Sequence, residues 1–281
     1  QCPVFMMTSG GGLTTVETAR QHPIRLVESG PAGGAILAGH IAMECGLDKV
    51  LSYDMGGTTA KICLIDGGRP QTSRTFEVDR QYRFTKGSGL PLRIPVIEMV
   101  EIGAGGGSIA QIDNLGRIQV GPESAGSEPG PACYGQGGTG ATVTDADVAL
   151  GRIAPAGFAG GSVQLSPDLA EAALDETIAQ KLNLDGPLAA FAVSEMVEEN
   201  MSNAARVHAV EQGKELAERT LIAFGGAAPL HACRMAEKLG MDRVIIPQGA
   251  GVGSAIGFLA APVSYEVVRS RYTQLAAFEP E

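Results

Sequence analysis

One stretch of this chain constrains its fold more than any other, the segment SYDMGGTTAK at residues 52–61. Apolar residues precede it at 50–51 and follow it at Ile62–Ile65, which predicts two strands joined by a tight turn. Asp54 ends the first strand, and the glycines after it leave backbone amides open to a close-approaching anion. A carboxylate in that position can hold Mg²⁺ or orient a water. The alternative is an ordinary hairpin turn, which is the commoner meaning of an isolated Asp-x-Gly-Gly.

The composition favours an α/β protein. The chain has 281 residues, of which 44% are hydrophobic, so it can bury a sizeable core as one large or two medium domains. Only 5% of the residues are aromatic and 39 are Gly, which indicates close backbone packing rather than an aromatic-rich sandwich. The net charge of −10 and the scattered basic residues favour neither a nucleic acid nor an anionic membrane as partner. Any phosphate site must therefore be local and built from backbone amides.

The cysteines and histidines argue against a disulfide framework and a structural zinc site. The five cysteines are widely spaced without a Cys-x-x-Cys pair, which fits reduced thiols and a cytoplasmic location. The four histidines show no short ligand spacing. The longest uncharged run, residues 249–265, is broken by glycines and Pro262, so we expect a buried segment and no membrane span. The chain begins at Gln1 with no visible signal peptide, and we expect a fragment or a processed product.

The segment before residue 52 carries a second glycine motif. We expect a short helix over 14–19, a strand at Ile24–Val27 and an apolar helix from about Ala35 to Cys45. The last helix follows ESGPAGG at residues 28–34. Small residues there let the helix pack close to a strand, and its free amides could face an anion. Close packing alone explains the motif equally well.

A third glycine run, GAGGGS at residues 103–108, follows a predicted strand over Val96–Ile102. Such a run either cradles a ligand or forms a tight bend, and we favour the ligand. Residues 121–151 have the composition of a linker, but the residues at Ala132–Tyr134 are of a buried type and predict an ordered segment. Thr142–Asp147 forms an N-cap signal for a short helix from Val148 to Gly151.

The second half is helical and then returns to α/β. We expect one helix from Pro167 to Leu182 and a longer one from Pro187 to Gln212. The charged residues of the longer helix are expected to form a solvated face; they are Glu195, Glu198, Glu199, Arg206 and Glu211. A strand at Thr220–Phe224, a Gly225-Gly226 turn, a helix and a strand near 243–247 follow, and a helix of small residues ends near Ala261. This order predicts a crossover with ligands at the carboxyl ends of the strands.

The arrangement of two glycine turns, each after an apolar strand and separated by a helical insertion, matches the plan of the actin, sugar kinase and Hsp70-type ATPase folds. The ordered set of motifs is more specific and closely resembles the hydantoinase A / 5-oxoprolinase family, which includes the ATP-using subunit of acetone and acetophenone carboxylases. The motifs lie at residues 28–33, 54–59, 103–110, 120–126, 129–135, 142–146 and 224–231. The likeness covers the chain from about Met6 to Ala261.

The resemblance implies an α/β fold, an actin-like (ribonuclease H-like) ATPase lobe with a mixed sheet flanked by helices and a helical insertion. Residues 1–281 would then be one hydantoinase A core domain, the second ATPase lobe. Its parts would be a phosphate loop near 52–61, a glycine-rich segment at 103–147, a helical segment at 166–213 and an adenosine-side strand-turn-helix at 220–261. Family members also carry an N-terminal lobe and a C-terminal region that this sequence lacks, so we expect this chain alone to bind ATP weakly and to turn over nothing.

The implied function is ATP-dependent hydrolysis of a cyclic amide, with Mg²⁺, in which the substrate carbonyl oxygen is phosphorylated and a B-type partner subunit or domain completes the reaction. A ketone as substrate, in a carboxylase, is an alternative. A small-metabolite kinase of the same fold and a non-catalytic ATPase-like scaffold are further alternatives, and a homo-oligomer is possible. Neither the substrate nor the choice between hydrolase and carboxylase follows from the sequence.

The resemblance also implies residue roles. Asp54 would be the catalytic and metal-holding carboxylate. Lys61 would clamp a phosphate or, equally, would be a strand-surface lysine that points away. The cofactor-binding residues, taken from the resemblance and from the glycine run together, are Gly56, Gly57, Thr58, Thr59, Lys61, Gly105, Gly106, Gly107, Ser108, Asp145, Gly225, Gly226 and Ala227.

Overall fold

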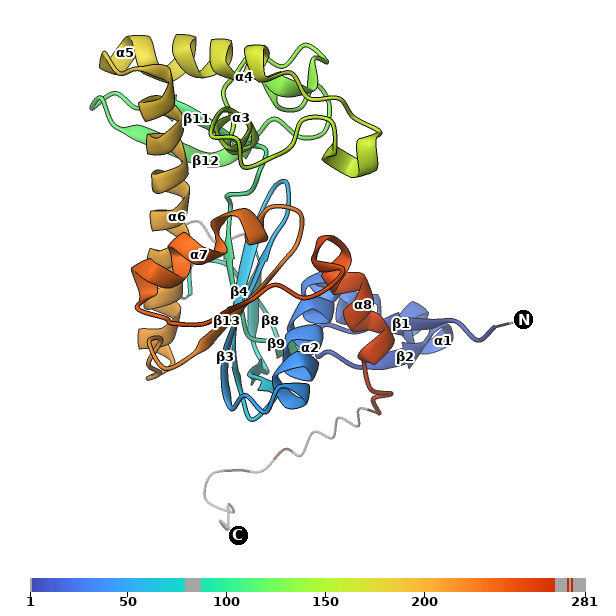
Figure 1. The fold of residues 1–281 in the computed structure, drawn as a ribbon. Helices are drawn as coiled ribbons and strands as arrows, with labels where there is room; N and C mark the ends of the chain where they lie inside the picture. The colour runs from blue at the N-terminus through green and yellow to red at the C-terminus, as the bar shows by residue number, and fades with distance from the viewer. Residues whose placement is uncertain (1, 79–86, 266–271, 273, 275–281) are drawn as a thin grey trace.

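A computed structural model describes residues 2–78, 87–265, 272 and 274. Its centre is a six-stranded sheet with helices on both faces, and a smaller part of the chain stands above one end of that sheet (Figure 1). The strand order is β10-β4-β3-β13-β14, with β5 (Arg69–Pro70) paired to β4. The mixed α/β architecture predicted from the sequence is confirmed.

The sheet combines both strand directions. The predicted strand-turn-strand is an antiparallel hairpin of β3 (Lys49–Met55) and β4 (Ala60–Asp66), and β10 (Val100–Ile102) pairs antiparallel with β4. On the other side, β13 (Thr220–Phe224) runs parallel to β3 and to β14 (Val244–Ile245). The carboxyl ends of β3 and β13 therefore meet at the same edge of the sheet.

Two pairs of helices cover the sheet. The helices α2 (Ser29–Glu44) and α8 (Gly253–Ala260) lie on one face, and α6 (Gly186–Glu211) and α7 (Ala228–Leu239) lie on the other (Figure 1). The strands alternate between the two cores, because successive side chains of a strand point to opposite faces. In β13, Leu221 and Ala223 join the core beneath α6 and α7, and Ile222 and Phe224 join the core beneath α2.

The smaller part combines a hairpin with short helices. Helix α6 continues from it along the sheet, so one long helix links the two parts (Figure 1). Its elements are β11 (Ser108–Ile112), β12 (Ile118–Ser124), η2 (Ala132–Tyr134), α3 (Val143–Ala149), η3 (Phe158–Gly161), α4 (Pro167–Leu174), the π-helical turn η4 (Asp175–Ala179) and α5 (Gln180–Leu182).

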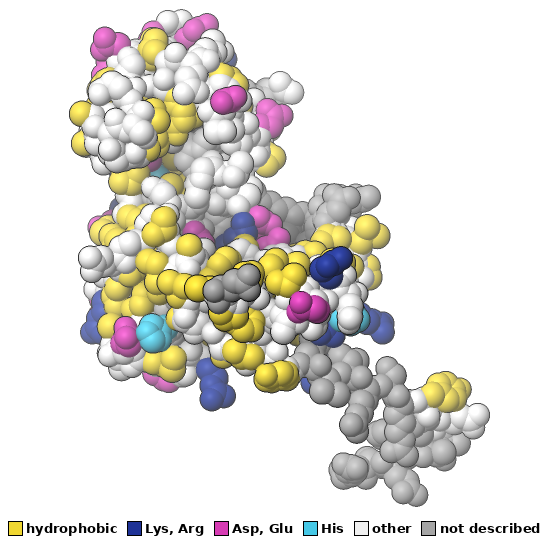
Figure 2. All heavy atoms as spheres, turned by 90° about the vertical axis from the view of Figure 1, so that its right-hand side faces the viewer, with side chains coloured by type: hydrophobic (Ala, Val, Ile, Leu, Met, Phe, Trp, Pro, Cys, Tyr) yellow, Lys and Arg dark blue, Asp and Glu magenta, His cyan; other side chains and the backbone are white. Residues whose placement is uncertain are grey.

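Short elements complete the described chain. They are β1 (Phe5–Met7), β2 (Leu13–Thr15), α1 (Val16–Gln21), η1 (Pro23–Leu26), the paired strands β6 (Thr72–Ser73) and β9 (Val96–Ile97), the paired strands β7 (Phe76–Val78) and β8 (Leu90–Leu92), and η5 (Ala250–Val252). The side that carries α8 and the N-terminal strands exposes large apolar side chains (Figure 2), among them Val4, Phe5, Leu259 and Val263.

Five local predictions were wrong. Ile24 lies in the 3₁₀ helix η1 and not in a strand, because Pro23 fixes a helical φ at its first position. The predicted strand at 96–102 is two short strands with different partners. The expected helix over 148–151 begins at Val143, and the single helix expected over 167–182 contains a π-helical turn. Glu198 is buried rather than part of a solvated face.

None of the helices within residues 2–78 and 87–265 combines the length and the apolar character that crossing a membrane requires.

Candidate functional site

Asp54 lies at the end of β3, where three other elements converge on its carboxylate. Its Oδ2 accepts a hydrogen bond from the Ser254 hydroxyl in the first turn of α8, at 2.8 Å. Glycines admit this arrangement, because a Cβ on Gly225 would lie 2.6 Å from Oδ1 and one on Gly34 would lie 3.1 Å from Oδ2. Burial raises the pKa of Asp54, against the opposing effects of the Ser254 hydrogen bond and the Lys61 charge. The carboxylate is thus half-buried and held on one side.

The Asp54 loop (residues 54–59) turns outward from this point. Gly57 and Thr58 are exposed, and a Cβ on Gly56 or Gly57 would meet no atom within 4 Å. The Gly56 amide donates to the Thr59 carbonyl at 3.1 Å and closes the turn. Open space next to these glycines leaves room for a ligand to approach the backbone closely.

The glycine bend (residues 103–108) packs behind the Asp54 loop. The Gly106 amide donates to the Gly56 carbonyl at 3.0 Å, and the Gly107 amide donates to the Gly57 carbonyl at 2.6 Å. A Cβ on Gly105 would lie 2.7 Å from the amide nitrogen of Thr58. Gly105, Gly106, Gly107 and Ser108 are all buried. The bend therefore supports the loop, and direct contact of these residues with a cofactor stays a prediction.

Asp145 has a structural environment. It is fully buried, and its carboxylate accepts hydrogen bonds from the Thr142 amide and hydroxyl and from the amides of Ala132 and Cys133, at 2.7–3.2 Å. Thr142 in turn accepts from the Asp145 amide, which completes a capping box at the start of α3. The predicted contact of Asp145 with a cofactor is not supported by this placement and stays a prediction.

Lys61 lies beside the Asp54 loop. It pairs directly opposite Asp54 in the β3–β4 hairpin, and its Nζ donates to the Thr59 hydroxyl at 2.7 Å. The same Nζ forms an ion pair with Glu101 at 3.0 Å. Glu28, just before α2, also interacts with this group: its pKa is raised first by burial and then by Glu101, and Lys61 opposes the change. Lys61 is thus a half-buried cation next to the loop, already shared with Glu101.

The Gly225 turn (residues 225–227) lies next to the Asp54 loop, because Phe224 pairs with Asp54 across the parallel strands. The Ala227 amide donates to the Met55 carbonyl at 2.9 Å. Gly225 has a φ of +95°, and a Cβ on it would lie 2.4 Å from that same carbonyl oxygen, so only glycine fits here. Gly226 is exposed, with open space where a Cβ would project. Two motifs far apart in the sequence thus form one site.

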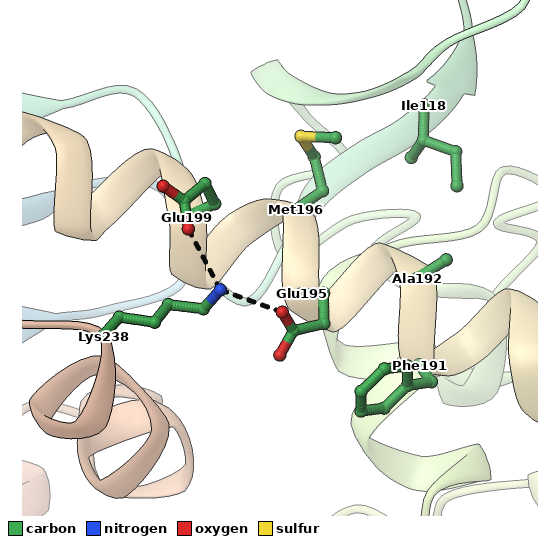
Figure 3. A pocket seen from close by; sticks show the side chains of 7 residues that line it. All are labelled: Ile118, Phe191, Ala192, Glu195, Met196, Glu199 and Lys238. Carbon is green, nitrogen blue, oxygen red and sulfur yellow. Dashed lines mark hydrogen bonds and ion pairs between the residues drawn. The ribbon is translucent and has the colours of Figure 1, made fainter.

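A cavity of about 500 Å³ lies elsewhere, between β12, α6 and α7 (Figure 3). Lys238 spans it with ion pairs to Glu195 at 2.9 Å and to Glu199 at 3.0 Å. Its lining consists of Ile118, Phe191, Ala192, Glu195, Met196, Glu199 and Lys238. None of the predicted site residues lines it.

Two buried or half-buried polar groups, Ser254 and Glu198, were not predicted from the sequence. Ser254 follows a glycine-rich run, which predicts close backbone packing and does not indicate a hydrogen bond from the Ser254 hydroxyl to Asp54. Glu198 was assigned to a solvated face, although Ser194 and Ser202 lie one turn away on either side, among small buried residues of α6. That spacing marks a buried polar stripe and could have identified Glu198.

Comparison with known proteins gives consistent results. A family profile described as hydantoinase/oxoprolinase matches residues 1–267. Caprolactamase subunit alpha of Pseudomonas jessenii is 37% identical over 266 residues, which cover 95% of this chain and 37% of the relative. The crystal structure of ATP-dependent caprolactamase from that organism is 36% identical with a TM-score of 0.79, and the match covers 94% of this chain and 37% of that chain.

A nucleotide-free structure of acetone carboxylase, an enzyme described as carboxylating acetone in an ATP-dependent reaction, is also similar. It has a TM-score of 0.81 to this chain at 29% sequence identity. This match covers 92% of the present chain and 35% of the acetone carboxylase chain. The present chain therefore spans little more than a third of the length of these caprolactamase and acetone carboxylase chains.

Proposed function

This chain belongs to the hydantoinase/oxoprolinase family, and on that premise we propose that it is a nucleotide-binding lobe of an ATP-dependent enzyme that hydrolyses a cyclic amide. One observation carries the proposal: the Asp54 loop and the Gly225 turn lie side by side at the carboxyl ends of β3 and β13. A mixed sheet with helices on both faces suits one lobe of an actin-like ATPase. The activity of the whole enzyme is part of the proposal, since the chain spans 37% of the caprolactamase subunit.

The residues of the Asp54 loop fit a phosphate group. The space beside Gly56 and Gly57 would be filled by a Cβ, and the exposed Gly57 and Thr58 present their backbone to it. For Mg²⁺, the described ranges hold no group of three or more His, Cys, Asp or Glu that could bind a metal. Asp54 as a single carboxylate still suits this ion, which is commonly held by one or two carboxylates together with waters and substrate phosphates.

Residues of the Asp54 loop and the Gly225 turn would have separate roles in binding the nucleotide. The Asp54 carboxylate would hold Mg²⁺ or orient a water, with Oδ2 fixed by Ser254. The amides and hydroxyls of residues 56–59 would bind the β- and γ-phosphates, with the Lys61 charge beside them, and residues 225–227 would line the adenosine pocket. Bound ATP would supply a phosphoryl group that makes an amide carbonyl oxygen a leaving group. An unstrained amide needs that activation because it is a poor electrophile.

Part of the reaction is assigned to a partner. The similar caprolactamase chain is named as a subunit alpha, which supports a multi-subunit enzyme. We place the hydrolytic step on a B-type subunit or domain. A ketone carboxylase is the second candidate, because the acetone carboxylase structure has a TM-score of 0.81 to this chain. A cytoplasmic location and a homo-oligomer stay predictions; all five cysteines are free thiols.

The test is phosphate release from ATP by the native protein, with and without its co-purifying partner. The substrates are lactams and hydantoins, ketones with bicarbonate, and sugars. Release that needs both a cyclic amide and the partner supports the hydrolase, and release with ketone and bicarbonate selects the carboxylase. Release with sugars and without the partner would contradict both the hydrolase and the carboxylase. Release by the Asp54→Asn variant equal to that of the unaltered protein would contradict them as well.

A further inference from the structure

A buried ion cluster lies where α3, α6 and α7 meet; it is formed by Asp147, Glu198 and His231 together with Arg152, whose side chain is 27% exposed. His231 Nε2 forms an ion pair with Asp147 Oδ2 of α3 at 3.1 Å, without the geometry of a hydrogen bond, and its Nδ1 forms a hydrogen bond with Glu198 Oε1 of α6, also at 3.1 Å. All three side chains are 1% exposed. Arg152 Nη1 lies 3.2 Å from Asp147 Oδ1 and 3.3 Å from Glu198 Oε1. Two buried carboxylates thus face one guanidinium and one imidazole, and the cluster is neutral only when the imidazole is protonated.

Other groups around His231 agree with that charge state. Asp147 and Glu198 outweigh burial and raise the pKa of His231 to about 9. Ser194 of α6 accepts from Arg152 at 2.6 Å and donates to Glu198 at 3.1 Å. From β3, the buried Tyr53 hydroxyl donates to Met55 Sδ at 2.9 Å, and burial together with the charges of Glu198 and Asp147 raises the pKa of that hydroxyl.

The same helices hold the Asp54 loop at their other contacts. In α3, one turn before Asp147, the Thr144 amide and hydroxyl both donate to the Gly106 carbonyl, at 2.7 and 2.8 Å. Gly106 in turn donates to the Gly56 carbonyl. Just before α7, one turn before His231, the Ala227 amide donates to the Met55 carbonyl at 2.9 Å. The Asp147–His231 pair therefore connects α3 and α7, the two helices whose hydrogen bonds support the backbone of the Asp54 loop.

We propose that His231, paired with Asp147 and Glu198, is a positioning residue that locks α7 to α3 and thereby sets the shape of the Asp54 loop. It is not a catalytic residue, because it is buried behind the loop. Its importance for nucleotide binding rests on the proposed function, whereas its effect on the loop does not. A cluster that merely stabilised the core would lower the stability of the fold without loosening the loop selectively.

Amide hydrogen exchange in the native protein tests this directly. In His231→Gln, exchange at Gly106, Gly107 and Ala227 should rise about tenfold relative to the β13 amides. Ser194→Ala is the matched control, because it removes a hydroxyl from the same cluster and leaves the His231 pairs intact; its loop exchange should change less than about threefold. A loop as protected as in the wild type, or an equal rise in both variants, overturns the proposal.

A second readout concerns the nucleotide. With a loop shaped wrongly for phosphate, the KM for ATP should rise about tenfold in His231→Gln with a smaller change in kcat, while Ser194→Ala stays near wild type. A fall in kcat with an unchanged KM contradicts the positioning role. If His231→Gln does not fold, Asp147→Asn takes the same two tests. The exchange readout needs no nucleotide, so its failure is distinct from failure of the proposed function, which would appear as no ATP turnover by the unaltered protein.

Discussion

The Asp54 loop and the glycine bend have similar glycine-dense sequences and opposite environments. At Gly56 and Gly57 a Cβ would project into open space, whereas at Gly105 it would collide with the backbone of Gly57 and Thr58 at 2.7 Å. The amides of Gly106 and Gly107 are already donated to the loop. Glycine density therefore indicates a close approach, but the approaching group can be a ligand or another stretch of the same chain. Substitutions on the supporting side, which includes Asp145 and α3, should mainly lower the stability of the fold. Substitutions on the loop side should mainly lower nucleotide binding or turnover.

The largest effect on stability is expected for Asp145→Ala, on the supporting side. The change leaves the Thr142, Ala132 and Cys133 amides without their acceptor inside the fold. We expect the free energy of unfolding to fall by about 3–5 kcal/mol, as for removal of one partner from a buried charged network. Urea denaturation measures it. Full stability combined with loss of nucleotide binding would instead make Asp145 a ligand contact, as the sequence first suggested.

Gly105→Ala tests the bend itself. Its Cβ would force the bend and the Asp54 loop apart, because the nearest atoms are backbone and cannot rotate away. Overpacking of this kind costs about 1–3 kcal/mol of unfolding free energy. Gly57→Ala is the matched control, since its Cβ meets nothing within 4 Å, and it should change stability by less than about 0.5 kcal/mol. Equal losses of stability in the two variants would remove the distinction between bend and loop.

The buried ion cluster should make the supporting side sensitive to alkaline pH. The folded state raises the pKa of His231 from 6.5 to about 9, so its contribution is fully present below the unfolded value and is lost as pH rises through 9. Between pH 7 and pH 10 we expect a loss on the order of 1–3 kcal/mol from this group. Denaturation at each pH measures it against His231→Gln, which should lack this component. Parallel pH profiles for the two proteins would refute the charge state.

The sequence predicted the parts of the fold that periodicity controls. The β3–β4 hairpin, β13, α6 and α7 lie close to where their patterns placed them. The sequence did not predict which charged side chains are buried and which groups they pair with. The spacing of Ser194, Glu198 and Ser202 indicates a buried polar stripe, but it does not encode the partners of Glu198, because His231 and Arg152 come from distant elements. The capping box of Thr142 and Asp145 was readable, but the Ala132 and Cys133 amides that complete the site of Asp145 were not.

Only a small change in stability is expected for Asp54→Asn, on the loop side, together with loss of ATP-dependent turnover in the native enzyme. Asparagine keeps an oxygen that can accept the Ser254 hydrogen bond and removes a charge whose burial raises the pKa of this carboxyl. Unfolding free energy should therefore change by less than about 1 kcal/mol, and the change can be stabilising. Denaturation and phosphate release on one preparation measure both. A variant that fails to fold would show that the carboxylate holds the sheet edge together, and the contrast between an open loop and its closed support would no longer separate function from structure.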